Sequence, residues 1–319
     1  MKIVYSPHYN IGFFGAERLH PFDSRKYGRA WKRMRRSMGP GLKKLHVRPD
    51  GPVKPKTLFT VHSADYIGRL HDSKYVAKAL EVSLVGRLPW RVIDWCVLRP
   101  MRWATQGTIV AAREAMRHGL AVNLSGGYHH AKPNGGEGFC IYSDIALAVH
   151  ALRDEGLLLR GDRVAYIDLD AHQGNGVCHA FRRDDRVFIF DMYNSTIYPS
   201  YDTEARTRID CDVRLTGNCT EGEYFSELRG KLPGFLDSVG DSTPIGLAIY
   251  NAGTDVFEDD ALGGLNVSSA GIVERDALVV DELRRRGIPT VMLLSGGYSS
   301  ESYKHVADSV LNLIDKQSN

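Results

Sequence analysis

Short apolar runs recur along this chain of 319 residues, and helical patterns lie between most of them. Nearly continuous apolar strands that alternate with helices indicate a mainly parallel sheet covered on both faces, which is a three-layer α/β/α fold. The runs are "KIVYS" at 2–6, "LAVNL" at 120–124, "RVAYIDL" at 163–169, "RVFIF" at 186–190, "IGLAIY" at 245–250 and "TVMLL" at 290–294. Because the chain has no Pro/Ser-rich linker, internal repeat or low-complexity tract, we expect a single domain.

The composition narrows the class of protein. A hydrophobic content of 43% and a charged content of 25% are typical of soluble globular proteins. A net charge of +3 is too small to imply nucleic-acid binding by itself. No apolar stretch approaches the roughly 18 residues of a transmembrane helix, and the chain starts directly with a strand. Five cysteines without a CxxC pair suit a reducing compartment, so we expect a cytoplasmic protein.

Polar or Gly-rich segments follow five of the predicted strands. They are "SGGYHHAKPNGGEGF", "DAHQGNG", "DMYNSTIYPS", "NAGTDVFEDD" and "SGGYSS". In open α/β sheets, ligands bind at the carboxyl ends of the strands. The Gly doublets let the backbone turn sharply and pass close to a ligand. The pattern therefore predicts an active site assembled from five dispersed segments.

The segment "YIDLDAHQGNG" at 166–176 contains candidate metal ligands. Asp170 and His172, two apart on an extended chain, point to the same side, and Asp255 at another strand end can supply a third ligand. One His and two carboxylates with an open position suit a catalytic Zn²⁺, or Fe²⁺. A DxH spacing alone is more often a solvated turn. Its combination with polar groups at other strand ends favours the metal site.

Two adjacent histidines, His129 and His130, follow the strand at 120–124. They can be ordinary loop residues, or a proton-handling pair beside the metal. Asp168 and Asn175 flank the candidate ligands and are the natural groups to orient the two imidazoles. A histidine oriented in this way can accept a proton from a water molecule whose pKa zinc lowers towards about 7.

Tyr298 follows the second Gly doublet. An isolated tyrosine after Gly-Gly is more often structural. Here its hydroxyl can instead donate to a carbonyl oxygen and stabilise the oxyanion as it forms. With the metal ligands and the histidine pair, it completes a set of groups for hydrolysing an amide.

The motifs "GGYHHAKPNGGEGFC", "YIDLDAHQGNG", "NAGTD" and "SGGY" resemble the zinc-dependent histone deacetylases of the arginase–deacetylase fold. The similarity runs over nearly the whole chain and implies one histone-deacetylase-like catalytic domain over residues 1–319. Class IV, the smallest single-domain branch, is the most similar. The motifs closest to it are "VYSPHYNI", "LHPFDSRKYG", "VLRPMRW", "IFDMYNSTIYP", "DALGGLNVSSAGI" and "ADSVLNL".

The resemblance implies roles for individual residues. The implied zinc ligands are Asp170, His172 and Asp255. The implied catalytic set is His129, His130, Asp168, Asn175 and Tyr298, with His130 as general base and general acid and Asp168 behind His129. Class I members have a carboxylate behind the second histidine, where this chain has Asn175. Because an amide cannot stabilise an imidazolium as a carboxylate does, we expect His130 to be less basic.

Two further sites follow from the resemblance. The implied acyl-lysine tunnel is lined by Gly138, Phe139 and Tyr198. The implied structural potassium ion is bound by Asp168, Asp170, His172, Asp191 and the carbonyl of Met192. A cation at that position explains how several carboxylates can stay ionised close together.

Three functions compete for this set of residues. The resemblance implies removal of acyl groups, acetyl or longer fatty acyl, from the Nε of lysine in proteins. A small-molecule amidohydrolase, such as an acetylpolyamine deacetylase, is the alternative. It needs acidic groups at the tunnel mouth and usually a dimer-forming insertion, and no insertion is evident. A catalytically silent acyl-lysine reader is disfavoured because every ligand and Tyr298 are present.

The stretch from Arg25 to Arg48 is basic throughout and contains no Asp or Glu. Trp31, Met34 and Met38 fall at helical spacing, which indicates one apolar stripe on a cationic helix. A solvated helix that packs this stripe on the body is the simpler interpretation. The functional alternative is weak contact with an acidic partner or anionic surface, without specific nucleic-acid recognition.

Overall fold

The computed structural model describes residues 1–12, 23 and 25–318. Part of the motif "LHPFDSRKYG", at positions 19–22 and 24, lies outside the described residues. In the described part of the chain, no helix is both long and apolar enough to cross a bilayer.

Eight strands in the described residues form one sheet, in the order β2-β1-β3-β8-β7-β4-β5-β6, and every pairing is parallel. The strands are β1 (Lys2–Val4), β2 (His46–Val47), β3 (Leu120–Asn123), β4 (Arg163–Asp168), β5 (Val187–Asn194), β6 (Cys211–Leu215), β7 (Ile245–Asn251) and β8 (Thr290–Leu293). All six predicted strands are present. The sequence patterns missed β2, which has two residues, and β6, whose "CDVRL" is half polar.

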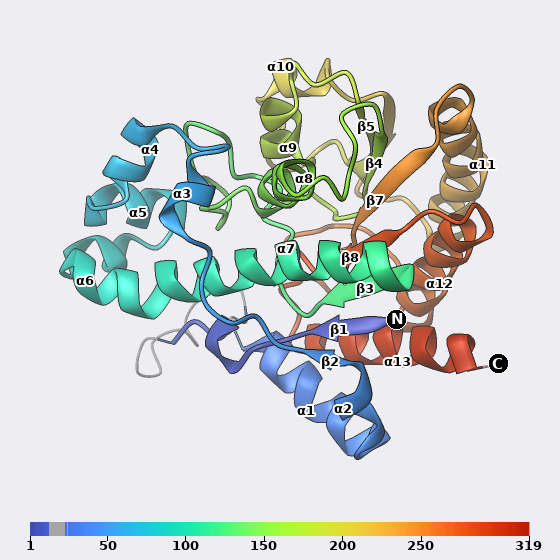
Figure 1. Ribbon diagram of the computed structural model, residues 1–319, viewed down its shortest axis with the longest axis horizontal. Helices are drawn as coiled ribbons and strands as arrows, with labels where there is room; N and C mark the ends of the chain where they lie inside the picture. The colour runs from blue at the N-terminus through green and yellow to red at the C-terminus, as the bar shows by residue number, and fades with distance from the viewer. Residues whose placement is uncertain (13–22, 24, 319) are drawn as a thin grey trace.

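Helices cover both faces of the sheet, as predicted for a three-layer α/β/α fold (Figure 1). Alternate residues of β4 enter two separate cores: Ala165 and Ile167 pack in one, Val164 and Tyr166 in the other. The first core includes α1 (Lys26–Met38), α11 (Glu221–Gly240), α12 (Ser269–Arg285) and α13 (Ser302–Ser318). The second includes α7 (Arg99–His118), α8 (Asp144–Asp154) and α9 (Asn175–Ala180). Such two-sided burial explains why these strands are continuously apolar.

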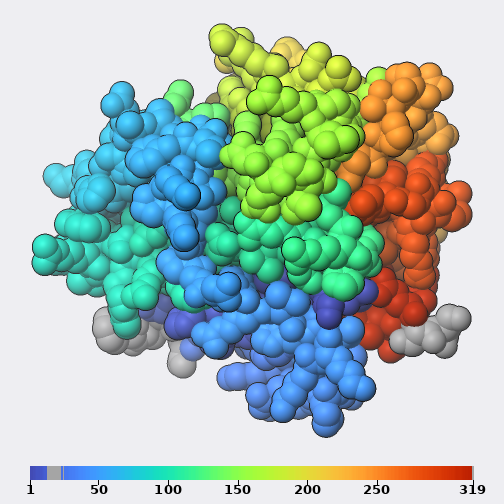
Figure 2. Space-filling view, in the orientation of Figure 1, coloured from blue at the N-terminus to red at the C-terminus, as the bar shows by residue number. Residues whose placement is uncertain are grey.

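The remaining helices are short. They are α2 (Gly41–Leu45), α3 (Pro55–Leu58), α4 (Ala64–Arg69), α5 (Ser73–Ala79), α6 (Trp90–Ile93) and α10 (Thr203–Arg206). Single turns of 3₁₀-helix cover Pro7–Tyr9 and Ser83–Arg87, and a π-helical turn covers Asp94–Leu98. In the space-filling view, the light-blue residues of α3, α4 and α5 form a lobe on the left of the molecule (Figure 2).

The basic stretch forms α1 and α2. Its apolar stripe packs on the body of the protein, in agreement with the simpler interpretation of a solvated surface helix. Met34 is fully buried, and Trp31 and Met38 pack against the first core. One residue departs from the expected cationic surface: Lys26 is fully buried. It begins α1, where the helix meets the strand-end loops, so it does not belong to the exposed face.

The central strands are in register near their carboxyl ends, which brings the loops that follow them to one edge of the sheet. Asp168 at the end of β4 pairs in register with Asp191 of β5 and with Asn251 of β7. Asn251 pairs with Leu293 of β8. The loops that carry the predicted polar residues therefore start from one edge of the sheet, as expected for its carboxyl ends.

Candidate active site

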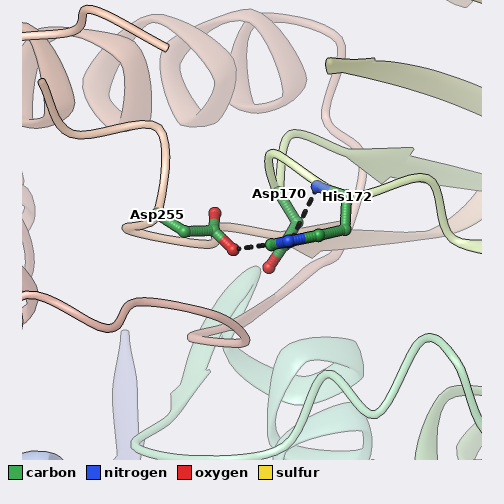
Figure 3. A group of neighbouring side chains, drawn as sticks. All are labelled: Asp170, His172 and Asp255. Atoms are coloured by element: carbon green, nitrogen blue, oxygen red, sulfur yellow. Dashed lines mark hydrogen bonds and ion pairs between the residues drawn. The ribbon is translucent and has the colours of Figure 1, made fainter. Parts of the chain in front are cut away.

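Asp170 and His172, in the loop after β4, face Asp255, in the loop after β7 (Figure 3). The Nδ1 of His172 lies 3.1 Å from an oxygen of each carboxylate. One ligand atom from each of the three residues fits within 4.8 Å of the others, and all three side chains are buried. The predicted ligands thus converge as a cluster of one nitrogen and two oxygen donors, which suits zinc with an open position.

The charges in this cluster favour a cation. Burial by itself lowers the pKa of His172, but the hydrogen bonds that its ring donates to Asp170 and Asp255 outweigh it and raise the pKa to about 10. Burial and the nearby charge of Asp170 raise the pKa of Asp255 to about 7. Two buried carboxylates this close are stable together only with positive charge between them. The donor set therefore fits a divalent metal ion.

Gly296, the first glycine of "SGGY", must be a glycine for steric reasons. A Cβ on it would lie 2.1 Å from Oδ2 of Asp255 and 2.6 Å from Oδ2 of Asp170. Its backbone N–H donates to Asp170 Oδ2 at 2.8 Å. This glycine lets the backbone pass close to the two carboxylates.

His129 is held by the carboxylate predicted to lie behind it. Its Nδ1 is 2.8 Å from Oδ2 of Asp168. Asp168 also accepts hydrogen bonds from the Tyr166 hydroxyl at 2.5 Å and from Nδ2 of Asn251 at 2.9 Å. Burial by itself lowers the pKa of His129, but the charges of Asp168 and Asp170 outweigh it and raise the pKa to about 9. His129 is therefore cationic at neutral pH.

His130 lies in a different environment, although its ring centroid is only 4.0 Å from that of His129. Its Nδ1 is 2.9 Å from Oδ1 of Asn175. Burial, followed by the charges of His129 and His172, lowers the pKa of His130 well below its ordinary value. The hydrogen bond with Asn175 acts in the opposite direction, so burial and the neighbouring charges, not the amide, lower this pKa.

The predicted tunnel residues lie next to His130 and Tyr298. The ring of Tyr198 lies 5.0 Å from that of His130, and the ring of Tyr298 lies 6.1 Å from that of Phe139 and 5.9 Å from that of His172. Gly138 has a φ of 52°, and a Cβ there would be 2.5 Å from Cδ2 of His130. A glycine is therefore required where this loop passes the histidine.

Tyr298 is held from its backbone. Its N–H donates to Oδ2 of Asp260 at 2.7 Å. Burial, then the charge of Asp255, raises the pKa of Tyr298 well above its ordinary value. The phenol therefore stays protonated at neutral pH and keeps its O–H as a hydrogen-bond donor.

The predicted potassium ligands Asp191 and Met192 are fully buried in β5. Oδ2 of Asp191 accepts from the N–H of Gly174 at 3.0 Å, whereas Oδ1 has no hydrogen-bond partner among the described residues. Burial and the charge of Asp168 raise the pKa of Asp191 well above its ordinary value. This carboxylate therefore has an unmet requirement for a cation or proton.

Four residues of the site were not predicted from the sequence. Asn251 donates to Asp168 from the end of β7, and its place at a strand end before "AGTD" was an available signal. Asp260 holds the backbone of Tyr298 and Ser299. Glu137 and Asp202 accept hydrogen bonds from Nδ2 of Asn175. For these three acids nothing in the local pattern distinguishes them from ordinary loop residues.

Comparison with known proteins agrees with this arrangement. Residues 20–314 match the histone deacetylase domain. The chain is 44% identical to histone deacetylase 2 of Arabidopsis thaliana over 313 residues, which cover 98% of this chain and 78% of that protein. An uncharacterised protein of Picosynechococcus sp. is 32% identical over 267 residues, which cover 82% of this chain and 85% of the relative.

Two solved structures share the fold at lower identity. The HD domain of HDA15 superposes with a TM-score of 0.74 and 19% identity over 99% of this chain and 90% of that chain. An acetylpolyamine aminohydrolase from Burkholderia pseudomallei gives 0.72 and 20% identity over 98% of this chain and 97% of that chain. The domain match and the plant relative, taken with the converged cluster, establish that the chain belongs to the histone deacetylase family.

Proposed function

We propose that this protein is a zinc-dependent deacylase that hydrolyses the amide of Nε-acyl-lysine in proteins. The observation that carries the proposal is the buried cluster of Asp170, His172 and Asp255 beside the histidine pair and the Tyr298 ring. Zinc bound by these residues would polarise the acyl carbonyl and make a water molecule more acidic. The metal could also be Fe²⁺, which accepts the same ligands.

The two histidines have complementary protonation states. With Nδ1–H donated to Asn175, His130 presents an unprotonated Nε2, and its lowered pKa keeps it neutral and able to accept a proton from water. His129, cationic through Asp168, adds positive charge where negative charge develops. His130 then returns the proton to the leaving lysine amine.

Tyr298 donates its hydroxyl to the carbonyl oxygen as that oxygen becomes negative. Its raised pKa keeps the proton in place, and the hydrogen bonds of Asp260 hold its backbone. A donor fixed before the reaction stabilises the oxyanion without reorganisation. Gly138, Phe139 and Tyr198 would enclose the acyl chain.

We place the protein with class IV and infer that it accepts long fatty acyl groups as well as acetyl. The motifs quoted from the sequence support this assignment. The alternative is a small-molecule amidohydrolase, and the acetylpolyamine aminohydrolase with the same fold makes acetylpolyamines the substrates to test against. Hydrolysis of acetyl-, octanoyl- and myristoyl-lysine peptides, compared with acetylputrescine, tests the proposal. Turnover of acetylputrescine alone would favour the small-molecule enzyme.

We also propose a structural potassium ion bound by Asp168, Asp170, His172, Asp191 and the carbonyl of Met192. The unpartnered Oδ1 of Asp191 supports it, because a buried carboxylate oxygen without a donor is costly. Thermal unfolding in KCl and in tetramethylammonium chloride at equal ionic strength tests this ion. Equal melting temperatures would contradict it.

The exposed face of α1 is the candidate for contact with an anionic surface. A cavity of about 700 Å³ between α1 and α13 is lined by Arg29, Lys32, Arg33, Arg36, Tyr303 and Leu311, among others. Asp23 pairs with Arg29, and Asp308 pairs with Arg33. Lys32 and Arg36 form no ion pair with any residue that the structure describes, so they carry the proposed attraction. Like the cytoplasmic location, this contact stays a prediction.

A further inference from the structure

The amide of Asn175 has three polar partners and is fully buried. Its Oδ1 lies 2.9 Å from Nδ1 of His130. Its Nδ2 donates to Oε1 of Glu137 at 2.5 Å and to Oδ2 of Asp202 at 2.9 Å. Each amide hydrogen therefore has a carboxylate acceptor, and the amide oxygen is left to face the histidine.

These two carboxylates determine which way the amide points. If the amide flipped, its oxygen would face two carboxylate oxygens, and two charge-assisted hydrogen bonds would be replaced by repulsion. With the oxygen facing His130, the Nδ1 of that imidazole has to carry the proton, since a bare nitrogen would meet a second acceptor. Nε2 is then the unprotonated nitrogen.

The carboxylates are themselves held in place. Nζ of Lys132 lies 2.9 Å from Asp202 and 3.0 Å from Glu137. Asp202 also contacts Nε2 of His179 at 3.0 Å and caps α10 by accepting from the N–H of Ala205. Burial by itself raises the pKa of Asp202, but the hydrogen bonds from Lys132, Asn175 and His179 outweigh it and lower the pKa below its ordinary value. Asp202 is therefore an anion throughout the neutral range.

We propose that Asp202, supported by Glu137, is a positioning residue that fixes the Asn175 amide and, through it, the Nδ1-protonated tautomer of His130. The inference deepens the proposed function, on which it rests for the role of His130 as a base. The negative charge behind His130 is then not on Asn175 itself but on Asp202, which lies between β5 and β6 on the far side of the Asn175 amide. His130 thus receives an oriented acceptor without a charged neighbour that would make it cationic.

The tautomer can be measured directly, without turnover. In the zinc-loaded protein labelled with ¹⁵N-histidine, wild-type His130 should show a protonated Nδ1 and an unprotonated Nε2. In Asp202→Asn/Glu137→Gln, neutral amides replace both anionic acceptors, and both tautomers should be populated. Assignment uses the signal lost in His130→Asn. An Nε2-protonated His130 in wild type, or an unchanged tautomer in the double variant, would overturn the proposal.

Kinetics separate positioning from a merely structural effect. In Asp202→Asn/Glu137→Gln, kcat should be roughly tenfold lower than in wild type, while KM and zinc content should stay within twofold of wild type. In an Asn175→Asp background, a carboxylate contacts His130 directly. Its two oxygens are both acceptors, so it needs no neighbour to orient it, and Asp202 only repels it. Adding Asp202→Asn/Glu137→Gln there should leave kcat unchanged or raise it. The same fractional loss in both backgrounds would indicate a structural role and contradict the inference.

A matched control is Asp184→Asn. Asp184 is also a partly buried carboxylate that pairs with a cation, Arg153, but it precedes β5 at the opposite edge of the sheet. Its substitution should change neither the tautomer of His130 nor kcat. If wild type hydrolyses no acyl-lysine peptide, the proposed function fails, while the tautomer measurement still decides the positioning role.

Discussion

The Nζ of Lys26 donates a hydrogen bond to the carbonyl oxygen of Ser295 at 2.8 Å, although the two residues are 269 positions apart. Lys26 also donates to the carbonyl oxygens of Gly296 at 2.6 Å and Gly297 at 3.3 Å, and the Tyr27 hydroxyl donates to Ser295. The first turn of α1 thus holds the backbone of the loop that ends in Tyr298. A residue that reads as part of a basic surface is instead part of the support of the active site.

Lys26→Met should lower kcat roughly tenfold to a hundredfold, because a displaced Tyr298 loop misplaces the oxyanion donor. It should also destabilise the fold, since the three carbonyl oxygens lose a buried cationic donor. Steady-state kinetics and urea unfolding measure the two effects. Lys32→Met, an exposed lysine on the same helix, is the control and should change neither. Unchanged kcat in Lys26→Met would contradict the supporting role.

The pH dependence of stability gives a separate prediction for Lys26. Burial, opposed by Asp255 and Asp170, lowers the pKa of Lys26 from 10.5 to about 8. Lys26 therefore binds fewer protons in the folded state than in the unfolded state between about pH 8 and 10.5, and its own contribution to the free energy of unfolding should rise with pH in that window. Urea unfolding at pH 7.5, 9 and 10.5 should therefore give a more positive slope of the free energy of unfolding against pH in wild type than in Lys26→Met. Equal slopes would refute the depressed pKa.

Removal of a proposed metal ligand should abolish hydrolysis. In Asp170→Ala or His172→Ala only two ligands remain, and two ligands bind zinc poorly. Chelation of wild type should have the same effect, with recovery on addition of zinc. Metal content by elemental analysis should fall in parallel with activity. Asp185→Ala, which removes a side chain that is 94% exposed, is the control. Full activity in a metal-free preparation would contradict the mechanism.

Tyr298→Phe removes one hydroxyl and should preserve folding and zinc content. Loss of a single oxyanion donor should lower kcat by roughly 10²–10³. KM should change much less, because the hydroxyl acts mainly in the transition state. An unchanged kcat would mean that Tyr298 has only a structural role.

Acyl-chain length tests the class IV proposal. We expect kcat/KM to rise from acetyl- to octanoyl- and myristoyl-lysine on one peptide sequence, because each methylene buried in the tunnel contributes about 0.8 kcal/mol. The comparison needs free peptide below its aggregation concentration. A steady fall of kcat/KM beyond acetyl would refute the preference for long chains.

The exposed face of α1 predicts salt-sensitive binding to anionic vesicles. Sedimentation with anionic vesicles should exceed that with neutral ones at 0.1 M salt and vanish near 1 M, where the Debye length shrinks to about 3 Å. Lys32→Glu/Arg36→Glu reverses two charges without breaking the Arg33–Asp308 pair and should abolish binding. If wild type and variant sediment alike, α1 is an ordinary solvated helix.

Much of the fold and of the metal cluster could be predicted from local sequence. The spacing of apolar residues and the residue types of turns can be read from neighbouring positions in the sequence. Continuous apolar runs therefore predicted β1, β3, β4, β5, β7 and β8. Parallel pairing then required their ends to share one edge. The convergence of Asp170, His172 and Asp255 follows from that geometry, since each lies a few residues beyond a strand end. The short β2 and the half-polar β6 lacked the apolar signal.

What the sequence by itself determined is therefore the sheet, the edge at which the site lies and the residue types gathered there. Only the tertiary structure decided which other residues support them: Lys26 in the first turn of α1, which holds the Tyr298 loop, and Asp202 and Glu137, which hold Asn175. These contacts join segments whose approach depends on how helices and long loops pack on the sheet, and no local periodicity encodes that packing. A buried lysine and an exposed one have the same letter in the sequence, and only the folded chain, by excluding water from one of them, makes them chemically different.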